Sequence, residues 1–250
     1  MRPGFATLYL YSTGIPVHTI TRPLWTALAA VILPADLLRF QSKRFARLYE
    51  RLLGFLMREG EKNSINGVIW YILGVNLSLQ LYPQDIATLS ILILSWADTA
   101  ASTVGRLYGR QTPPLPASIP LFPLLSSFAP VRNIPIVGTV VQSRIPLAKR
   151  KSLAGFLAAG LTASLVTGIF LGGVSTCRTI WEPTWLSPTS APGFDSKSGP
   201  GLLAVSLVAG VVSAVVESME VPGGLDDNVT LPVLVGFGLW AFLRAFKTFF

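Results

Sequence analysis

Polar side chains that can do chemistry gather at the ends of apolar segments in this chain. Asp98 lies near the end of one such segment, in LSWADTAASTVGRLYG. An ionised carboxylate costs about 2.5 to 3.5 kcal/mol at the centre of a membrane helix and less toward its edge, so this position calls for a metal ion or an arginine as partner. The small and hydroxyl residues Thr99, Ser102 and Gly105 would let a phosphate or metal approach the backbone. We interpret Asp98 as functional, with a structural ion pair as the alternative.

Two arginines continue the same segment. Arg106 and Arg110 lie one and two helical turns past Ser102 if the helix continues, so both could be aimed at phosphate oxygens. The alternative is that they only anchor the cytosolic end of a membrane span.

A second basic cluster, Lys149 to Lys151, precedes a later apolar segment that opens with Ser152 and includes Gly155. Free amides and the macrodipole at a helix N-terminus favour an anion, so a triphosphate could be held there. The chain contains no Gly-Lys pair, which excludes the P-loop of soluble kinases.

A third group, Asp226 to Asn228, stands just before another apolar segment. Paired carboxylates with an amide are the hard oxygen ligands that suit Mg²⁺ shared with phosphates. A helix N-cap formed by Asn228 or Asp227 is the alternative. One cap does not need two adjacent carboxylates with Glu217 close before them, so the pattern favours metal binding.

The composition indicates a membrane protein. Of the 250 residues, 51% are hydrophobic and 13% charged, whereas a soluble domain carries about 25% charged residues. The formal net charge is +8, but the basic residues alternate with apolar spans, which argues against nucleic acid and favours anionic lipid or a phosphorylated substrate. A single cysteine and a single histidine exclude a disulfide framework and a Cys/His zinc site within one chain.

The apolar segments predict an all-α, polytopic transmembrane helix bundle of six to seven spans, with residues 1–250 as one domain. Six segments approach the roughly 20 residues that a span needs. A seventh, Gly4 to Val17, is too short and is expected to be a partial first span. The six run from Leu24 to Phe40, Asn66 to Tyr82, Asp85 to Val104, Leu153 to Val174, Gly201 to Glu217 and Val229 to Phe246.

The charges between the spans predict the sides of the membrane. Residues 41–65 hold six Lys or Arg, and residues 105–151 hold seven with no acidic residue, so both should face the cytosol. Alternation then puts residues 218–228 on the cytosolic face. Three polar groups would meet there: Asp36 to Asn66, Asp98 to Lys151, and Glu217 to Asn228. Within the first group, Asp36 and Arg39 are spaced to pair with each other.

The sequence resembles the fungal diacylglycerol kinases that use CTP, a family related to dolichol and phytol kinases, over nearly its whole length. The resemblance implies transfer of the γ-phosphate of CTP to diacylglycerol, giving phosphatidate, at the endoplasmic reticulum or nuclear envelope with the active-site loops in the cytosol. The matching pieces are GFATLYLYSTGI, the Asp36 and Arg39 segment, GFLMREGEKNSINGVIWYILG, DIATLSILILSWADTAASTVGRLYG, KSLAGFLAAGLT and GLDDNVTLPVL.

The resemblance assigns three sets of residues to the family's motifs. Asp98 and Gly105 would belong to the central motif, Lys151 to Gly155 to the second, and Asp226 to Asn228 to the third. The expected partners are CTP, diacylglycerol and membrane lipid, with no nucleic acid, and protein partners are left open. The expected catalytic residues are Asp98, Lys151 and Asp227, the Mg²⁺ ligands Asp98, Asp226 and Asp227, and the nucleotide-binding residues Thr99, Ser102, Gly105, Arg106, Ser152, Gly155 and Asn228.

Two features depart from the family's pattern. Members begin with a basic Arg-Lys pair and a His, whereas this chain starts inside the first span. We therefore expect a truncated start, in which Arg2 partly replaces the basic element. An inactive homologue is one outcome of that truncation. Residues 113–147 form a proline-rich insertion that should not be helical and receives no role.

Three competing functions stay open at the level of the sequence. A dolichol or long-chain alcohol kinase would use the same nucleotide motifs with a different acceptor. A phosphatidate cytidylyltransferase would use similar acids and bases but release pyrophosphate. A transporter or scaffold would place ionisable residues at the bilayer midplane, whereas here they lie at the ends of the spans.

Overall fold

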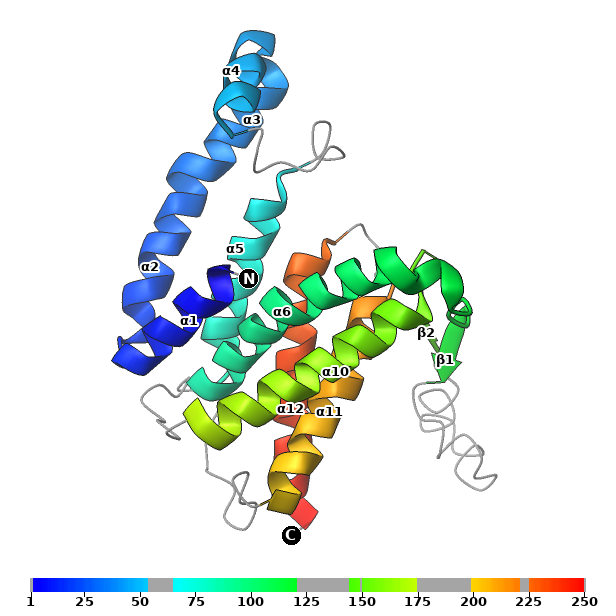
Figure 1. Ribbon diagram of the computed structural model, residues 1–250. Helices are drawn as coiled ribbons and strands as arrows, with labels where there is room; N and C mark the ends of the chain where they lie inside the picture. Colours follow the sequence, from blue (N-terminus) through cyan, green and yellow to red (C-terminus); the bar gives the residue numbers. More distant parts are fainter. Residues whose placement is uncertain are drawn as a thin grey trace, which may run out of the picture.

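The computed structural model describes residues 2–53, 65–120, 144–148, 150–174, 199–220 and 225–249, and these are mostly helical (Figure 1). Two short strands, β1 (Ser118–Pro120) and β2 (Arg144–Pro146), form an antiparallel ladder. The helical elements are α1 (Arg2–Thr13), α2 (Val17–Ala27), η1 (Leu28–Ile32), α3 (Leu33–Gln41), α4 (Lys43–Leu53), α5 (Gly67–Leu81), α6 (Gln84–Tyr108), η4 (Gly109–Gln111), α10 (Leu153–Ile169), η5 (Phe170–Val174), α11 (Gly199–Ser218) and α12 (Asp227–Phe249).

All six segments predicted as spans are helical, and the chain is a multi-pass membrane protein. Among the described residues, four helices are long and apolar enough to cross a bilayer: Val17–Gln41, Gln84–Gln111, Leu153–Gly173 and Gly199–Ser218. The helix α5 has 15 residues, fewer than the roughly 20 that a span needs. The helix α12 has 23 residues but opens on Asp227 and Asn228. The total of six to seven spans therefore stays a prediction.

The N-terminal region differs from the predicted boundaries. The helix α1 has 12 residues, which gives it a length of about 18 Å and leaves it short of the roughly 30 Å hydrocarbon core. It ends before Gly14, whose φ of 66° is the left-handed conformation that glycine adopts at helix ends. The next helix begins at Val17, seven residues before the predicted Leu24, and continues through the π-helical turn η1 into α3.

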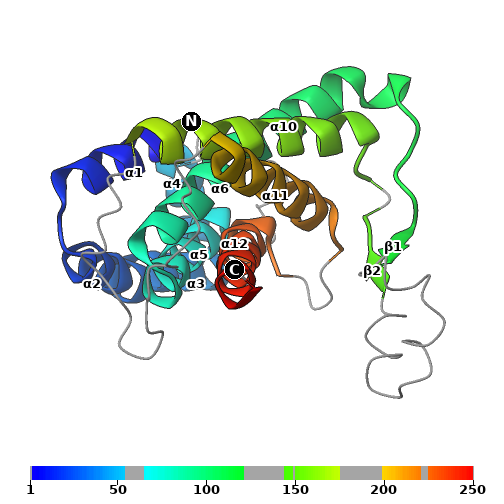
Figure 2. The same cartoon turned by 90° about the horizontal axis from the view of Figure 1, so that it is seen from below.

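The helix α6 lies at the centre of the bundle. Its residues Ala87, Leu92, Ile93 and Ala97 are completely buried. It packs along α10, which runs in the opposite direction (Figure 1). Viewed from below, α11 lies between α10 and α12 (Figure 2), and α6 packs against both α10 and α12. This arrangement brings the end of α6, the start of α10, the end of α11 and the start of α12 to one side of the molecule.

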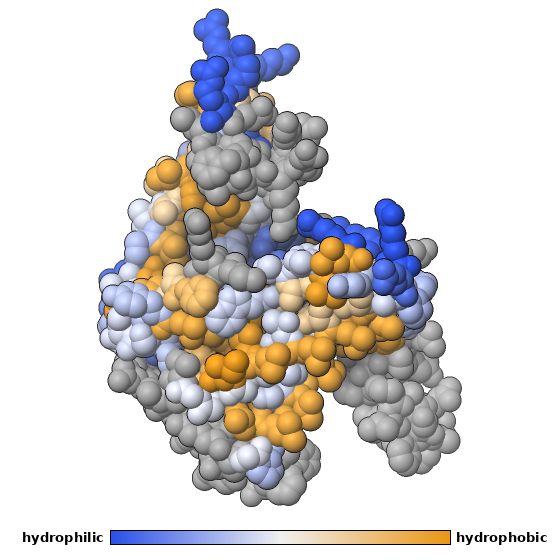
Figure 3. Space-filling view, in the orientation of Figure 1, coloured by the Kyte–Doolittle hydropathy of each residue, from blue (hydrophilic) through white to orange (hydrophobic). Residues whose placement is uncertain are grey.

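The outer surface of α10 is apolar. Leu157, Leu161, Leu165 and Ile169 recur every four residues, so they share one helix face, and each is 52 to 68% exposed. In Figure 3 an apolar band crosses the lower part of the molecule, below the hydrophilic surface over α4 and the hydrophilic surface near the end of α6. A continuous apolar surface of this kind is compatible with lipid and would be unusual in water.

A glycine lets α5 approach the start of α12. A Cβ atom at Gly74 would lie 2.3 Å from the backbone oxygen of Asn228 and 3.0 Å from the Cα atom of Val229. Both neighbours are backbone atoms at the opening of α12, so they cannot rotate away as a side-chain end could. The close approach of these two helices therefore requires glycine at position 74.

We predict that Gly74→Ala lowers the thermal unfolding midpoint in detergent, because overpacking of this kind costs about 1–3 kcal/mol. The control is Gly173→Ala, where nothing lies within 4 Å of the added Cβ atom. The midpoint should fall in the first variant and stay close to that of the parent protein in the second. An equal effect in both variants would contradict the packing argument.

Candidate active site

The ammonium group of Lys151 joins the ends of three helices. Its Nζ atom lies 2.5 Å from Oε1 of Glu217 and 3.2 Å from Oδ2 of Asp227. Lys151 stands two residues before α10, Glu217 is next to last in α11, and Asp227 is the first residue of α12. Arg150 adds a weaker contact, with its Nη2 atom 3.9 Å from the same Asp227 oxygen. The predicted convergence of the second and third polar groups is thereby confirmed.

Negative charge dominates around Lys151. The carboxylates of Asp98 and Asp227 lie close enough to act electrostatically on Glu217. The Glu217 side chain is 4% exposed, against 22% for Lys151 and 32% for Asp227. Its second oxygen, Oε2, is buried without a hydrogen-bond partner among the described residues. Buried carboxylate oxygens usually have a hydrogen-bond partner, and a bound water or ion would supply one here.

Lys151 stays protonated in this setting. Burial by itself lowers the pKa of Lys151, but the charges and hydrogen bonds of Glu217 and then Asp227 outweigh it, and the pKa lies above its ordinary value of 10.5. The carboxylates therefore keep a fixed positive charge at the junction of the helices across the physiological pH range.

Backbone pairing positions Lys151 beside Glu217. The N–H of Ala148 donates to the carbonyl of Ser218 at 2.8 Å, and the N–H of Glu220 donates to the carbonyl of Pro146 at 3.0 Å. The segment before α10 thus runs antiparallel to the segment after α11. Pro146 belongs to the end of the proline-rich insertion. The described parts of this insertion are extended and, as predicted, not helical. Residues 121–143 of the insertion lie outside the described residues.

Part of the α10 N-terminus is already hydrogen-bonded within the protein. Ser152 is the N-cap and accepts the N–H of Gly155 at 3.2 Å, while the N–H of Ala154 donates to Oγ1 of Thr112 at 3.3 Å. These bonds reduce the number of donors that remain for an anion. Nucleotide binding by Ser152 and Gly155 stays a prediction, and Lys149 lies outside the described residues.

Glycines hold the end of α6 against the start of α10. A Cβ atom at Gly155 would lie 3.1 Å from the carbonyl oxygen of Ala101, and one at Gly105 would lie 3.4 Å from Oγ of Ser152. Both positions therefore contribute to a close helix contact. The nucleotide role of Gly105 stays a prediction.

The hydroxyl residues after Asp98 bond to their own helix. The Oγ1 of Thr99 donates to the carbonyl of Ser95 at 2.7 Å, and Oγ of Ser102 donates to that of Thr99 at 3.0 Å. Their hydroxyl protons are in use, and their oxygens can still accept hydrogen bonds. Asp98 is partly buried and Arg106 is exposed.

The cap of α12 is Asp226, and not Asn228 or Asp227, the two residues considered for a cap as the alternative to metal binding. The Oδ1 atom of Asp226 accepts the backbone N–H of Asn228 at 2.9 Å and the Nδ2 group of the same residue at 2.7 Å. Asp227 is thereby free to reach Lys151. Within the described ranges no three His, Cys, Asp or Glu side chains lie together as a ready metal cluster. The metal role of Asp98, Asp226 and Asp227 stays a prediction.

The first polar group forms a cluster of its own. Arg39 and Asp36 pair at 3.0 Å with side-chain exposures of 3% and 4%. Asn66 donates its N–H to Oδ2 of Asp36 at 3.3 Å and its Nδ2 group to the hydroxyl of Tyr49 at 2.9 Å. The expected Asp36–Arg39 pair is confirmed. Figure 1 places α3 and α4 away from the end of α6, so this cluster braces α3, α4 and α5.

Glu217 is the residue that sequence reasoning noted but did not assign to the site. The only signal was its position as the acidic residue that ends an otherwise apolar span. Its contact with Lys151 depends on which helices are neighbours, and the sequence alone does not give that information.

Comparison with known proteins identifies the family. The chain is 33% identical over 249 residues to CTP-dependent diacylglycerol kinase 1 of Saccharomyces cerevisiae. The matched residues are 98% of this chain and 71% of that protein. It is 37% identical over 199 residues to the protein of the same name in Schizosaccharomyces pombe, with 80% and 70% covered. The chain belongs to the CTP-dependent diacylglycerol kinase family. The resemblance drawn from the motifs is therefore confirmed.

A third member of the CTP-dependent diacylglycerol kinase family, from Eremothecium gossypii, is 32% identical over 231 residues, which are 92% of this chain and 61% of that protein. No family model matches the chain. No solved structure matches it either.

The raised pKa of Lys151 makes stability depend on alkaline pH. The unfolded pKa of lysine is about 10.4. A group whose pKa is higher in the folded protein stabilises the fold fully at pH values below the unfolded pKa, and this stabilisation is lost as the pH rises through the folded pKa. We expect the unfolding midpoint of this family member to fall above about pH 10, and Lys151→Met to remove that part of the fall.

The measurement is thermal unfolding in detergent from about pH 8 to about pH 11.5, a range that brackets the lysine titration, with Lys43→Met as the control because Lys43 is exposed on α4. The control should keep the parent's pH profile. Loss of the alkaline fall in both variants, or in neither, would contradict the assignment to Lys151.

Proposed function

We propose that this chain is a CTP-dependent diacylglycerol kinase, which transfers the γ-phosphate of CTP to the free hydroxyl of diacylglycerol and produces phosphatidate and CDP. The observation that carries the proposal is the junction of Lys151 with Glu217 and Asp227 beside Asp98, at one end of a membrane helix bundle. The names of the relatives, CTP-dependent diacylglycerol kinase 1, support CTP as the phosphate donor and diacylglycerol as the acceptor.

Phosphoryl transfer asks mainly for positioning and for neutralisation of charge on the γ-phosphate. The protonated Lys151, with Arg106 exposed in the last turn of α6, supplies positive charge for the phosphate oxygens. Asp98 accepts the proton of the lipid hydroxyl as the oxygen attacks phosphorus, and the bond from the γ-phosphorus to the bridging oxygen of CDP breaks. Asp98 suits this role because it lies nearest the apolar part of α6, from which a lipid would approach.

The donor set is compatible with Mg²⁺. Sites for this ion in nucleotide enzymes use one or two carboxylates together with the substrate's phosphates, so no cluster of three is required. Asp98 and Asp227 would hold the ion, with Asp226 next to Asp227 in sequence, and Oε2 of Glu217 is one further buried oxygen in the same junction. When bound, Mg²⁺ supplies charge neutralisation on the phosphates.

We also propose that the whole chain forms one kinase domain with six spans, α5 and α12 included, in the endoplasmic reticulum and nuclear envelope. The charge distribution supports the cytosolic side for the junction, because residues 105–151 carry seven basic and no acidic residues. The cytosol is also where CTP would reach Lys151, while diacylglycerol would enter from the bilayer.

The test is transfer of label from γ-labelled CTP to diacylglycerol in detergent micelles. Labelled phosphatidate should form with CTP and not with ATP. Asp98→Asn should reduce the rate about 100-fold or more, since loss of a general base costs about 10² to 10⁴. The matched control is Asp85→Asn, the same change at the opposite end of α6, which keeps an acceptor for the Tyr11 hydroxyl.

The products separate the competing reactions. Release of CDP supports kinase chemistry, whereas release of pyrophosphate would indicate a cytidylyltransferase. Transfer to dolichol and not to diacylglycerol would show that the protein is a kinase with a different lipid acceptor. Equal losses in Asp98→Asn and Asp85→Asn would contradict the catalytic role of Asp98.

A further inference from the structure

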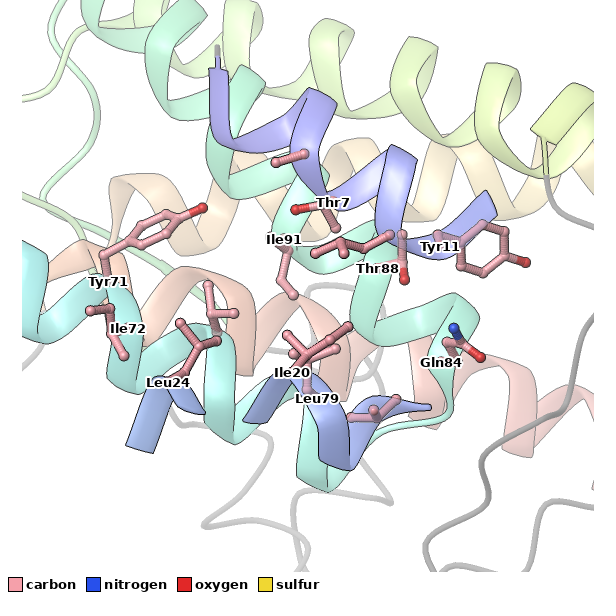
Figure 4. A pocket seen from close by; sticks show the side chains of 14 residues that line it. Thr7, Tyr11, Ile20, Leu24, Tyr71, Ile72, Leu79, Gln84, Thr88 and Ile91 are labelled. Atoms are coloured by element: carbon pink, nitrogen blue, oxygen red, sulfur yellow. The ribbon is translucent and has the colours of Figure 1, made fainter. Parts of the chain in front are cut away.

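A cavity of about 230 Å³ lies between α1, α2, α5 and α6 (Figure 4). Its walls are mostly apolar: Ile20 and Leu24 come from α2, Ile72 and Val75 from α5, and Ile91 from α6. An apolar cavity of about 150 Å³ already stays dry and accepts benzene, so this larger one suits an apolar ligand and not water.

The cavity lies among membrane-spanning segments. Two of its walls, α2 and α6, belong to the apolar helices Val17–Gln41 and Gln84–Gln111. Another wall, α1, is only 12 residues long, so it cannot cover the neighbouring spans over their full height. Tyr11, one of the few polar lining residues, donates its hydroxyl to Asp85 and offers little to a polar ligand.

One face of α6 connects the cavity to Asp98. Gln84, Thr88 and Ile91 line the cavity, and Ser95 and Asp98 continue the same series at intervals of three and four residues, which keeps side chains on one helix face. Tyr71, also a lining residue, lies close to the side chain of Ser95. Asp98 is seven residues past Ile91, which corresponds to about 10 Å along the helix.

We propose that this cavity binds one acyl chain of the diacylglycerol acceptor while its free hydroxyl lies at Asp98. The inference rests on the proposed function and adds to it the part of the lipid that the protein recognises. Transfer of a chain from lipid to an apolar cavity yields little hydrophobic gain, because lipid tails are as apolar as leucine. The benefit is positional: a chain held along α6 fixes the depth and orientation of the hydroxyl, which raises the rate of attack.

Chain length provides the test. An acyl chain of six carbons is about a third as long as an oleoyl chain, so with the free hydroxyl at Asp98 it reaches at most the near edge of the cavity, whereas an oleoyl chain extends well into it. Dioleoylglycerol should use the cavity, and dihexanoylglycerol should not. The quantity to measure is the ratio of kcat/KM for these two acceptors, in the same mixed micelles and with CTP as donor.

The variant Val75→Phe fills the cavity from α5, and Leu24→Trp fills it from α2. Both should lower the dioleoyl to dihexanoyl ratio about ten-fold, because a pocket one or two methylene groups too small discriminates to that extent. The control is Val211→Phe, the same change at a residue on α11 that is 64% exposed, and it should leave the ratio unchanged. Unfolding midpoints identify a cavity variant that fails to fold. The other cavity variant, on the other helix, then provides the test.

Unchanged ratios in the folded cavity variants, or equal losses with both acceptors, would overturn the acyl-chain assignment and leave the kinase assignment standing. Absence of transfer to either acceptor by the parent protein would instead overturn the proposed function and this inference with it. A ratio that also falls in Val211→Phe would show that the effect is not specific to the cavity.

Discussion

The arrangement of the helix ends depends on one charged group, the ammonium of Lys151. Its bonds to Glu217 and Asp227 join the segment before α10 to the end of α11 and the start of α12. Removing one partner from a buried ion pair leaves an uncompensated charge and costs about 3–5 kcal/mol, somewhat less where one partner is partly exposed as here. The three helix ends therefore cannot move independently without separating opposite charges.

The proposed reaction makes a second demand on the same group. A triphosphate that approaches Lys151 must share it with the carboxylates that hold it in the free protein, and those carboxylates repel the phosphate. Positive charge from the divalent ion and from Arg106 on α6 would relieve that repulsion. In the proposed reaction these residues would therefore act chiefly by charge compensation, which phosphoryl transfer through a loose transition state mainly needs.

The sequence predicted the parts of the site that depend on local pattern. Asp98 was found because a carboxylate in an apolar segment is costly, and Lys151 and Asp227 because they stand at the openings of apolar helices. The alternative of a cap at Asp227 or Asn228 lay one or two residues from the actual cap at Asp226, because several adjacent side chains can accept the same amides. The Glu217 contact was missed because it joins residues 66 positions apart, and the start of α2 was misjudged because Pro23 is tolerated within that helix.

The antiparallel pairing of β1 with β2, and of residues 146–148 with residues 218–220, has a consequence for how the chain can change over evolution. The two points at which the proline-rich segment leaves and rejoins the helices are fixed by main-chain bonds that do not depend on what connects them. The entropy of closing a loop grows only with the logarithm of its length, so each doubling costs about 0.6 kcal/mol. Residues can therefore be gained or lost within this connection while the spacing of Thr112, Ser152 and Lys151 is preserved, and the length of the connection is nearly neutral to selection on the reaction.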